Sequence, residues 1–183
     1  MRKLVESTFV TLDGVIGDPQ VWGMSYWDAE HNEYARRLLF SADALLLGRK
    51  TYEGFAAAWP TMTDEVGFAD KMNTMAKYVV SSTLRELTWN NSSLVEGDVA
   101  EGVAKLKEQA GGDILVAGSA TLVRTLLEHD LVDELRLMVY PILLGSGKRL
   151  FGDSASGKAF RLLELRAVGD DGVVILRYEP VRA

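Results

Sequence analysis

Residues 114–119 read Ile-Leu-Val-Ala-Gly-Ser, an apolar run that stops at a glycine and a hydroxyl residue. Two earlier stretches have the same form: residues 44–48 read Ala-Leu-Leu-Leu-Gly, and residues 78–82 read Tyr-Val-Val-Ser-Ser. Short, uninterrupted apolar runs of this kind are typical of strands buried on both faces of a parallel sheet. Each run follows a span long enough for a helix, so the sequence predicts repeated strand–helix–strand units.

The N-terminal part of the chain adds a strand and a helix to this pattern. Residues 3–11 are rich in β-branched and aromatic side chains and predict a first strand. The strand is expected to end at Leu12-Asp13-Gly14, because Asp and Gly are favoured in turns. Apolar residues then recur at helical spacing and predict a helix over residues 28–40.

The C-terminal part of the chain differs from the rest. Residues 134–139, 160–167 and 173–178 are strand-like, and Gly169-Asp170-Asp171-Gly172 predicts a hairpin connection between the last two. We therefore expect an α/β fold of three layers. Helices would cover both faces of a mixed, mostly parallel central sheet that has antiparallel strands at its C-terminal edge.

Composition narrows the class of protein. No repeat, low-complexity segment or Pro-rich linker divides the chain, so we expect a single domain over residues 1–183. A net charge of −6 without a run of Lys or Arg argues against a nucleic-acid partner. The absence of Cys excludes disulfides, thiolate zinc sites and a cysteine nucleophile. No signal peptide and no apolar window of membrane-spanning length are evident, so we expect a cytoplasmic protein without a membrane partner.

The ends of the buried strands are the first place to search for a site, because ligands of open parallel sheets lie beyond the carboxyl ends of the strands. After the run at residues 44–47 come Gly48, Arg49 and Thr51 at the start of a helix. Thr51 is expected to cap that helix, and the planar guanidinium of Arg49 suits a phosphate. The alternative is an ordinary capped helix with solvated cations.

The other two strand ends carry small and hydroxyl residues. Ser81 and Ser82 could bond a ribose or a phosphate, or they could simply terminate the strand by bonding local backbone. Gly118 would let the backbone approach a pyrophosphate at the start of the next helix. The pattern is not the GxGxxG fingerprint, which disfavours a standard Rossmann domain. We expect the three strand ends to converge on one ligand.

Taken in order, these motifs resemble the dihydrofolate reductase superfamily. The matching segments are Asp13-Gly14-Val15-Ile16-Gly17, residues 47–53, Ser81-Ser82 and Ala117-Gly118-Ser119. Residues 113–119, 131–135 and 141–145 look especially like the C-terminal reductase domain of bacterial riboflavin-biosynthesis deaminase-reductases. The resemblance covers nearly the whole chain.

The resemblance implies NADPH as the cofactor, with Arg49 biasing the choice toward the 2′-phosphorylated form. It implies a mobile loop in which Val15 and Ile16 lie near the nicotinamide. In dihydrofolate reductases, the position that resembles Ala117-Gly118 is a Gly-Gly pair joined by a cis peptide bond. The cofactor-binding residues that it implies are Val15, Ile16, Gly48, Arg49, Thr51, Ser81, Ser82, Ala117, Gly118, Ser119 and Thr121.

The function implied is an NADPH-dependent reductase that transfers a hydride to a small heterocyclic substrate, similar to 5-amino-6-(5-phosphoribosylamino)uracil reductase. A true dihydrofolate reductase and a non-catalytic NADPH-binding or regulatory protein are the alternatives. No catalytic residue is assigned and no metal is expected. The candidate substrate residues are Trp22, Trp27, Asp28 and His31, with Met24 and Tyr26 beside them.

Two further expectations concern substrate phosphate and assembly. The glycine-rich loop at residues 144–149 could contact a phosphate of the substrate, or it could be a plain basic turn between strands. The apolar residues 135–140 are expected to form an edge strand that needs covering, which predicts a C2 homodimer.

Overall fold

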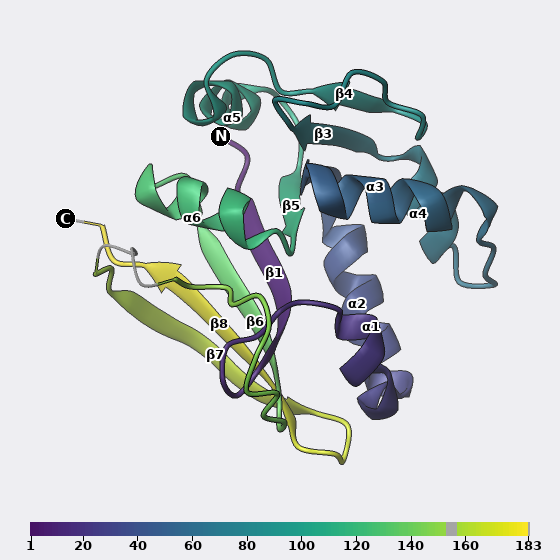
Figure 1. Ribbon diagram of the computed structural model, residues 1–183, viewed down its shortest axis with the longest axis vertical. Coiled ribbons are helices and arrows are strands. Elements are labelled where there is room, and N and C mark those ends of the chain that lie inside the picture. Colours follow the sequence, from purple (N-terminus) through teal and green to yellow (C-terminus); the bar gives the residue numbers. More distant parts are fainter. Residues whose placement is uncertain (153–156, 183) are drawn as a thin grey trace.

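The computed structural model describes residues 1–152 and 157–182, and its described strands form one eight-stranded sheet (Figure 1). The strand order is β4-β3-β2-β5-β1-β6-β8-β7. The strands are β1 (Leu4–Thr11), β2 (Ala42–Gly48), β3 (Ala76–Val80), β4 (Ser92–Leu94), β5 (Asp113–Ala117), β6 (Glu134–Tyr140), β7 (Phe160–Val168) and β8 (Val173–Pro180). The helices are α1 (Pro19–Trp22), α2 (Ala29–Ser41), α3 (Arg49–Ala58), α4 (Phe68–Thr74), α5 (Val99–Glu108) and α6 (Ala120–Glu128), with 3₁₀ turns at Met24–Tyr26 and Trp59–Thr61.

The directions of the strands confirm the predicted mixed sheet. From β4 to β6, every neighbouring pair is parallel, whereas β8 runs antiparallel to both β6 and β7. Residues 169–172 connect β7 to β8, as the hairpin signal predicted. The three-residue strand β4 was not predicted, because Ser-Ser-Leu contains neither an apolar run nor a clear alternation.

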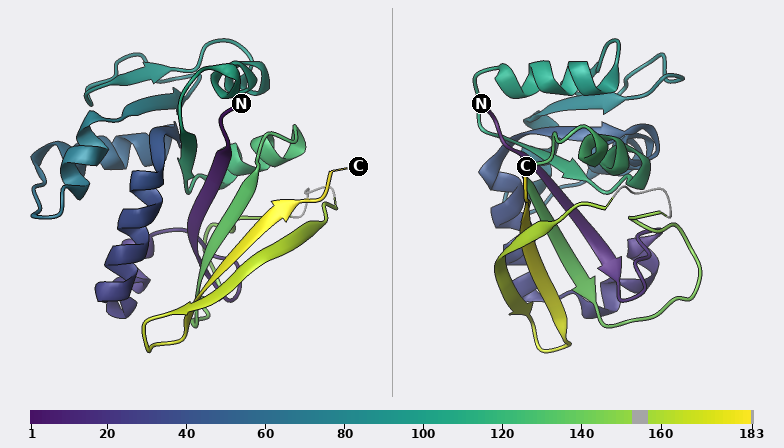
Figure 2. Two further views of the ribbon diagram at one scale, coloured as in Figure 1. Left: turned by 180° about the vertical axis from the view of Figure 1, so that it is seen from behind. Right: turned by 90° about the vertical axis from the view of Figure 1, so that its left-hand side faces the viewer.

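Helices cover the two faces of the parallel part of the sheet (Figure 2). On one face, apolar residues of α5 and α6 pack against the sheet in a core that includes Val103, Val123 and Leu126. On the other face, Leu39 of α2 and Tyr52 of α3 belong to a second core. The helices on each side bury an apolar face against the sheet, so the fold has three layers: helices, sheet and helices. This confirms the predicted α/β architecture.

The homodimer prediction placed the edge of the sheet wrongly. The strand formed by residues 135–140 is part of β6, which lies inside the sheet between β1 and β8. The edge strand on this side is β7, which pairs only with β8 among the described residues. Local apolarity could not reveal this, because the C-terminal hairpin returns to cover β6 only in the folded chain.

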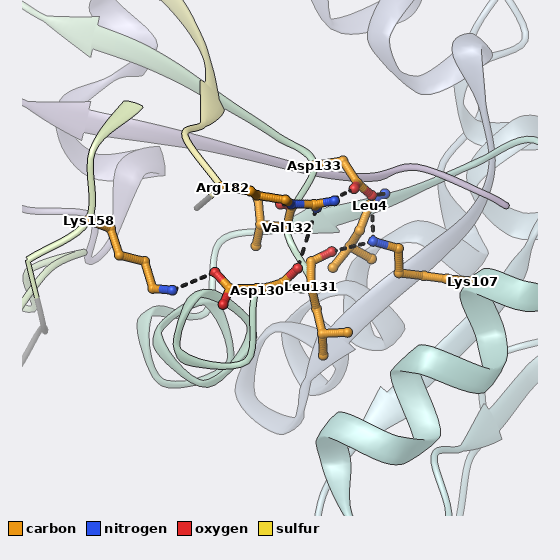
Figure 3. Close-up of polar contacts among 8 residues, drawn as sticks. All are labelled: Leu4, Lys107, Asp130, Leu131, Val132, Asp133, Lys158 and Arg182. Atoms are coloured by element: carbon orange, nitrogen blue, oxygen red, sulfur yellow. Dashed lines mark hydrogen bonds and ion pairs between the residues drawn. The ribbon is translucent and has the colours of Figure 1, made fainter. Parts of the chain in front are cut away.

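A polar cluster ties together the end of the sheet where β1 and β6 begin (Figure 3). The carboxylate of Asp133 accepts hydrogen bonds from the amide of Leu4 (2.8 Å) and from Arg182 (2.7 Å), and it pairs with Lys107 (2.6 Å). Lys107 also donates to the carbonyl of Leu131. The cluster joins α5, β1, β6 and the C-terminal segment at the end of the sheet opposite to the strand ends that carry the candidate site.

The sheet splits at its centre, and this split positions the candidate site. β1 pairs with β5 only over Leu4 to Ser7, because β5 ends at Ala117, but β1 pairs with β6 as far as Thr11. Beyond Ser7, the side of β1 that faced β5 therefore has room for a ligand. Within the described ranges, no helix has the length and apolarity needed to cross a bilayer.

Candidate functional site

A cavity of about 1080 Å³ opens where the parallel strands end, and it gathers residues from seven separate segments of the chain. The strand ends that sequence reasoning singled out, at Gly48, Ser81 and Gly118, all line it. Every residue predicted to contact the cofactor lines this cavity except Val15: Ile16, Gly48, Arg49, Thr51, Ser81, Ser82, Ala117, Gly118, Ser119 and Thr121.

The helices α3 and α6 begin side by side at the cavity. A Cβ at position 48 would overlap the hydroxyl of Ser119 and would lie 3.1 Å from its Cβ. This close approach favours glycine at position 48 even though its φ of −76° is open to any residue. Gly118 has a φ of +57°, a left-handed conformation that favours glycine, and the described peptide bonds around it are trans.

Both helix N-termini leave their first amides available. Gly48 precedes α3 and Ser119 precedes α6, and among the described residues neither helix start has a side-chain hydrogen bond that caps it. The prediction that Thr51 caps α3 is wrong, because the helix begins at Arg49 and Thr51 lies inside its first turn. Unpaired amides and the positive end of the helix dipole at two adjacent helices favour an anion.

Cations add to the positive potential of this end of the cavity. Lys50 and Lys148 line it together with Arg49. Burial lowers the pKa of Lys148, and the nearby charges of Lys50 and Arg124 lower it further, so these cations are close enough to repel one another. Arg49 forms an exposed ion pair with Glu53 at 3.2 Å, which leaves it accessible to another anion.

The loop after β1 is anchored rather than free. Asp13 accepts hydrogen bonds from the Thr11 hydroxyl (2.6 Å) and from the amide of Gly145 (2.8 Å). The Thr11 bond, and after it the amides of the glycine-rich loop, lower the pKa of Asp13 to about 2. The two loops are thereby held together, and Arg149 donates to the carbonyl of Asp13.

This anchoring corrects the prediction for Val15. Its side chain is 1% exposed and packs where a Cβ on Gly147 would stand, so it points into the loop contact instead of the cavity. The amide of Ile16 donates to the carbonyl of Lys148 at 2.8 Å. Lys148 thus reaches the cavity because the glycine-rich loop of residues 144–149 is paired with the loop after β1, and the predicted mobile loop is pinned at this point.

The predicted substrate residues are placed elsewhere. Trp22 packs edge-on against Tyr140, with ring centroids 5.2 Å apart, and donates its indole N–H to the carbonyl of Gly17. The ring centroids of Trp27 and Phe9 are 5.6 Å apart. Within the described part of the chain, only Phe9 of this aromatic cluster lines the cavity. The cluster forms because α1, α2 and β6 converge, which periodicity along α2 could not reveal.

Asp28 and His31 form a pair at the start of α2. Asp28 accepts from the amide of His31 (2.9 Å) and lies 2.8 Å from its Nδ1, so it caps the helix and holds the imidazole. The hydrogen bond from His31 lowers the pKa of Asp28. His31 is fully buried, and its Nε2 has no partner among the described residues. The imidazole of His31 packs against Trp27 and Tyr140 of the aromatic cluster, and neither Asp28 nor His31 lines the cavity.

Several lining residues carried no signal in the sequence. On the side of β3 and β4 they are mostly small or apolar, and on the side of β1 they belong to the strand itself or to α1. No spacing rule connects them, because they meet only when the sheet folds. They are Ser7, Thr8, Phe9, Asp18, Pro19, Gln20, Phe55, Val95, Gly97, Val99, Leu122 and Thr125.

Comparison with known sequences identifies relatives over nearly the full length. A family model described as the RibD C-terminal domain matches residues 2–174. The uncharacterised protein YyaP of Bacillus subtilis strain 168 is 30% identical over 184 aligned residues, covering 97% of this chain and 94% of YyaP.

Three solved structures share the fold. A Shewanella sp. PV-4 protein provisionally assigned to riboflavin biosynthesis superposes with a TM-score of 0.77 at 24% identity, covering 98% of this chain and 99% of that one. A Thermotoga maritima diaminohydroxyphosphoribosylaminopyrimidine deaminase/5-amino-6-(5-phosphoribosylamino)uracil reductase gives 0.67 at 17% identity, covering 98% and 57%. The dihydrofolate reductase of Enterococcus faecalis, complexed with NADP(H), gives 0.63 at 15% identity, covering 97% and 96%. These matches confirm the dihydrofolate reductase-like fold.

Proposed function

We propose that this chain, which belongs to the RibD C-terminal domain family, is an NADPH-dependent reductase that transfers a hydride to a small heterocyclic substrate. The substrate class would resemble that of 5-amino-6-(5-phosphoribosylamino)uracil reductases. One observation carries the proposal: two adjacent, uncapped helix N-termini and several cations converge at the carboxyl ends of a parallel sheet, around a cavity of about 1080 Å³.

The chemistry of the cavity fits the phosphates of a dinucleotide. Amides at the starts of α3 and α6 would bind the pyrophosphate, and the close approach at Gly48 brings both helix starts within reach of one group. Lys50 and Lys148 would neutralise its charge. These cations repel one another, and an anion bound between them would reduce that repulsion. This gain in electrostatic energy favours binding of the anion.

The same end of the cavity supports NADPH over NADH. Arg49 is exposed and loosely paired, so it can exchange Glu53 for a 2′-phosphate with bidentate geometry. Ser81 and Ser82 also line the cavity, and they follow Val80, which pairs with Gly48 in the sheet. Ser81 already accepts from the amide of Leu84 at 2.9 Å, and Arg85 donates to the carbonyl of Ser82, which stiffens the segment that would meet the adenosine half.

The reduced nicotinamide supplies the hydride when it is bound, and the protein supplies orientation and a dry site. Phe9, Ile16 and Pro19 form an apolar wall on the β1 side of the cavity. The stretch of β1 beyond Ser7 lies next to this wall, with its edge no longer paired with β5. A planar heterocycle would stack against the wall and exclude water from the reacting face.

The glycine-rich loop offers few groups to a phosphate on the substrate. In the glycine-rich loop of residues 144–149, Lys148 is the described residue that reaches the cavity. The amides of Leu144 and Gly145 are bound to Asp13, so they are not available to a ligand. The predicted phosphate contact of this loop therefore reduces to the ammonium group of Lys148, the group that would also neutralise the cofactor pyrophosphate.

Calorimetric titration tests the cofactor proposal. NADPH should bind more tightly than NADH, and Lys50→Gln and Lys148→Gln should each weaken NADPH binding by about tenfold, the value expected for losing one charge-assisted contact. Lys105→Gln is the matched control, because Lys105 is exposed on α5 and does not line the cavity. Absence of NADPH binding by the folded wild-type protein would refute the cofactor assignment.

Turnover distinguishes the candidate activities. NADPH oxidation should be measured with an aminopyrimidine ribosyl phosphate, with dihydrofolate and with a flavin. Activity with the first supports the reductase proposal, whereas activity with dihydrofolate alone supports a true dihydrofolate reductase. Tight NADPH binding with no turnover on any of the three would favour a non-catalytic NADPH-binding or regulatory protein.

We also propose a homodimer, in which the contact between the two copies is formed by β7. This edge strand exposes Leu162, Leu163 and Leu165 at 49%, 43% and 65%. An apolar edge of this kind is unusual in a protein that stays monomeric, and a second copy would cover it with C2 symmetry. Light scattering should give a dimer for the wild-type protein and a monomer for Leu165→Arg. A monomeric wild-type protein at micromolar concentration would refute the dimer.

A further inference from the structure

Glu6 is a buried carboxyl group that the proposed site leaves without a role. It lies in the middle of β1 and is 0% exposed. Neither Oε1 nor Oε2 has a hydrogen-bond partner among the described residues. An unpaired carboxyl in the interior costs folding free energy, and unsatisfied buried groups of this kind are rare in folded proteins unless they serve a function.

The surroundings favour the neutral form of this carboxyl. In the sheet, Glu6 is level with Val116 of β5 and Leu135 of β6. Burial raises its pKa well above the ordinary value, an effect that the nearby Ser7 amide opposes without forming a bond of normal geometry. No charged residue contributes to that shift.

The charged groups on the elements around this part of the sheet are engaged elsewhere. Lys107 of α5 and Asp133 before β6 pair with each other at 2.6 Å. Arg124 of α6 donates to the carbonyl of Ala120. On β6, Glu134 pairs with Arg136 and lies on the face opposite to the Leu135 side chain. Among the described residues, Glu6 therefore has neither a counter-ion nor a like charge that would set its protonation state.

Glu6 lies one step along β1 from the floor of the cavity. Ser7 and Thr8 line the cavity, and Thr8 shares a face of the strand with Glu6 because side chains alternate. The Cα atoms of residues two apart on a strand are about 7 Å from each other, a distance that the glutamate side chain can largely cover. The Thr8 hydroxyl lies 3.9 Å from where a Cβ on Gly118 would stand, at the start of α6.

We propose that Glu6 is the proton reservoir for the reduction and that it delivers its proton to the bound substrate through the hydroxyl of Thr8. This inference rests on the proposed reductase function. Glu6 would be a positioning residue that acts through Thr8, and Thr8 would be the group in contact with the substrate.

The step balances as follows. A hydride from the reduced dinucleotide adds two electrons and one hydrogen to the carbon of a C=N or C=C bond of the heterocycle. The Thr8 hydroxyl donates its proton to the neighbouring atom of that bond, and Glu6 returns a proton to the Thr8 oxygen. Glu6 is left as a carboxylate, which regains a proton from solvent once the product leaves and water enters the cavity.

Infrared spectroscopy tests the protonation state without any turnover. At neutral pH, the wild-type protein should show the carbonyl stretch of a protonated carboxylic acid, and Glu6→Gln should lose that band. Glu108→Gln is the control, because Glu108 is exposed on α5 and should leave the band unchanged. Absence of the band from the wild-type protein would overturn the proposal, whether or not the protein binds NADPH.

Single-turnover kinetics test the proton path. Glu6→Gln and Thr8→Val should each slow hydride transfer by about 10²-fold, the lower end of the range for general acid catalysis, with NADPH affinity unchanged. In the wild-type protein the rate should fall as the pH rises through the elevated pKa of Glu6, and Glu6→Gln should abolish that dependence.

A purely structural role gives a different result. In that case Glu6→Gln would change the melting temperature but not the pH profile of hydride transfer, and Glu6→Leu would be more stable and fully active. Either result would overturn the proposal. Failure of NADPH to bind would instead reject the proposed function, and the infrared band would still report on Glu6 separately.

Discussion

The close approach of α3 and α6 gives the sharpest prediction, for Gly48→Ala. The φ and ψ of Gly48, −76° and 160°, suit alanine, so the backbone itself creates no strain. The added Cβ would overlap the Ser119 hydroxyl, lie 3.1 Å from the Ser119 Cβ and 4.0 Å from the Leu122 Cβ. The Ser119 hydroxyl can rotate away, but its Cβ cannot. The two helix starts must therefore move apart by a few tenths of an ångström.

The size of the effect follows from overpacking. Extra methyl groups in a well-packed interior typically cost about 1–3 kcal/mol. Because both helix starts would bind the same pyrophosphate, we expect Gly48→Ala to lower unfolding stability by about 1–2 kcal/mol and to weaken NADPH binding by about tenfold. Urea unfolding and calorimetric titration measure the two effects.

A second substitution should rescue the first. Ser119 has a φ of +66°, a left-handed conformation that costs a non-glycine residue about 1 kcal/mol. Ser119→Gly removes that strain and also the atoms that collide with the new methyl group. The double variant Gly48→Ala/Ser119→Gly should therefore regain both wild-type stability and NADPH affinity.

A matched control separates sterics from a general effect of losing glycine. Gly54 lies inside α3, and a Cβ there would have no neighbour within 4 Å. Gly54→Ala should stabilise the protein by about 1 kcal/mol through helix propensity and leave NADPH binding unchanged. If Gly48→Ala bound NADPH as well as the wild-type protein, or if Ser119→Gly failed to rescue it, the argument from close approach would be refuted.

Three further predictions concern stability. Burial raises the pKa of Asp133, but the bonds from Lys107, Leu4 and Arg182 outweigh it and the pKa lies below its ordinary value. Its stabilisation is therefore present at neutral pH and lost as the pH falls through the lowered pKa, and Asp133→Asn should cost about 2 kcal/mol in urea unfolding at pH 7 but little in strong acid. Lys77→Met should cost about 3 kcal/mol, because the buried ammonium donates to three carbonyls at 2.9 Å. Asp13→Asn should speed hydrogen exchange at Gly145, and in the wild-type protein that amide should stay protected until the pH falls to about 2.

The sequence could not give the positions of side chains that depend on contacts between distant segments. Val15 was expected beside the cofactor, but it packs against Gly147 because Asp13 draws the two loops together. Trp22 and His31, two of the candidate substrate residues, lie outside the cavity lining and pack against Tyr140 of β6. Side-chain direction in loops and at helix starts depends on such long-range packing, which no local periodicity encodes.

The amino-acid sequence by itself determined the α/β class and the three strand ends at Gly48, Ser81 and Gly118. Apolar runs that end at small residues are local features, and parallel strands joined by crossover helices bring their carboxyl ends to one edge of the sheet. Only the tertiary structure decided which residues complete the cavity. Lys148 enters it through a loop pairing, β7 rather than β6 forms the edge, and the carboxyl oxygens of Glu6 have no hydrogen-bond partner among the described residues. These outcomes depend on the burial and the charge surroundings of each residue in the folded sheet. Both are set by contacts between residues that are far apart in the sequence.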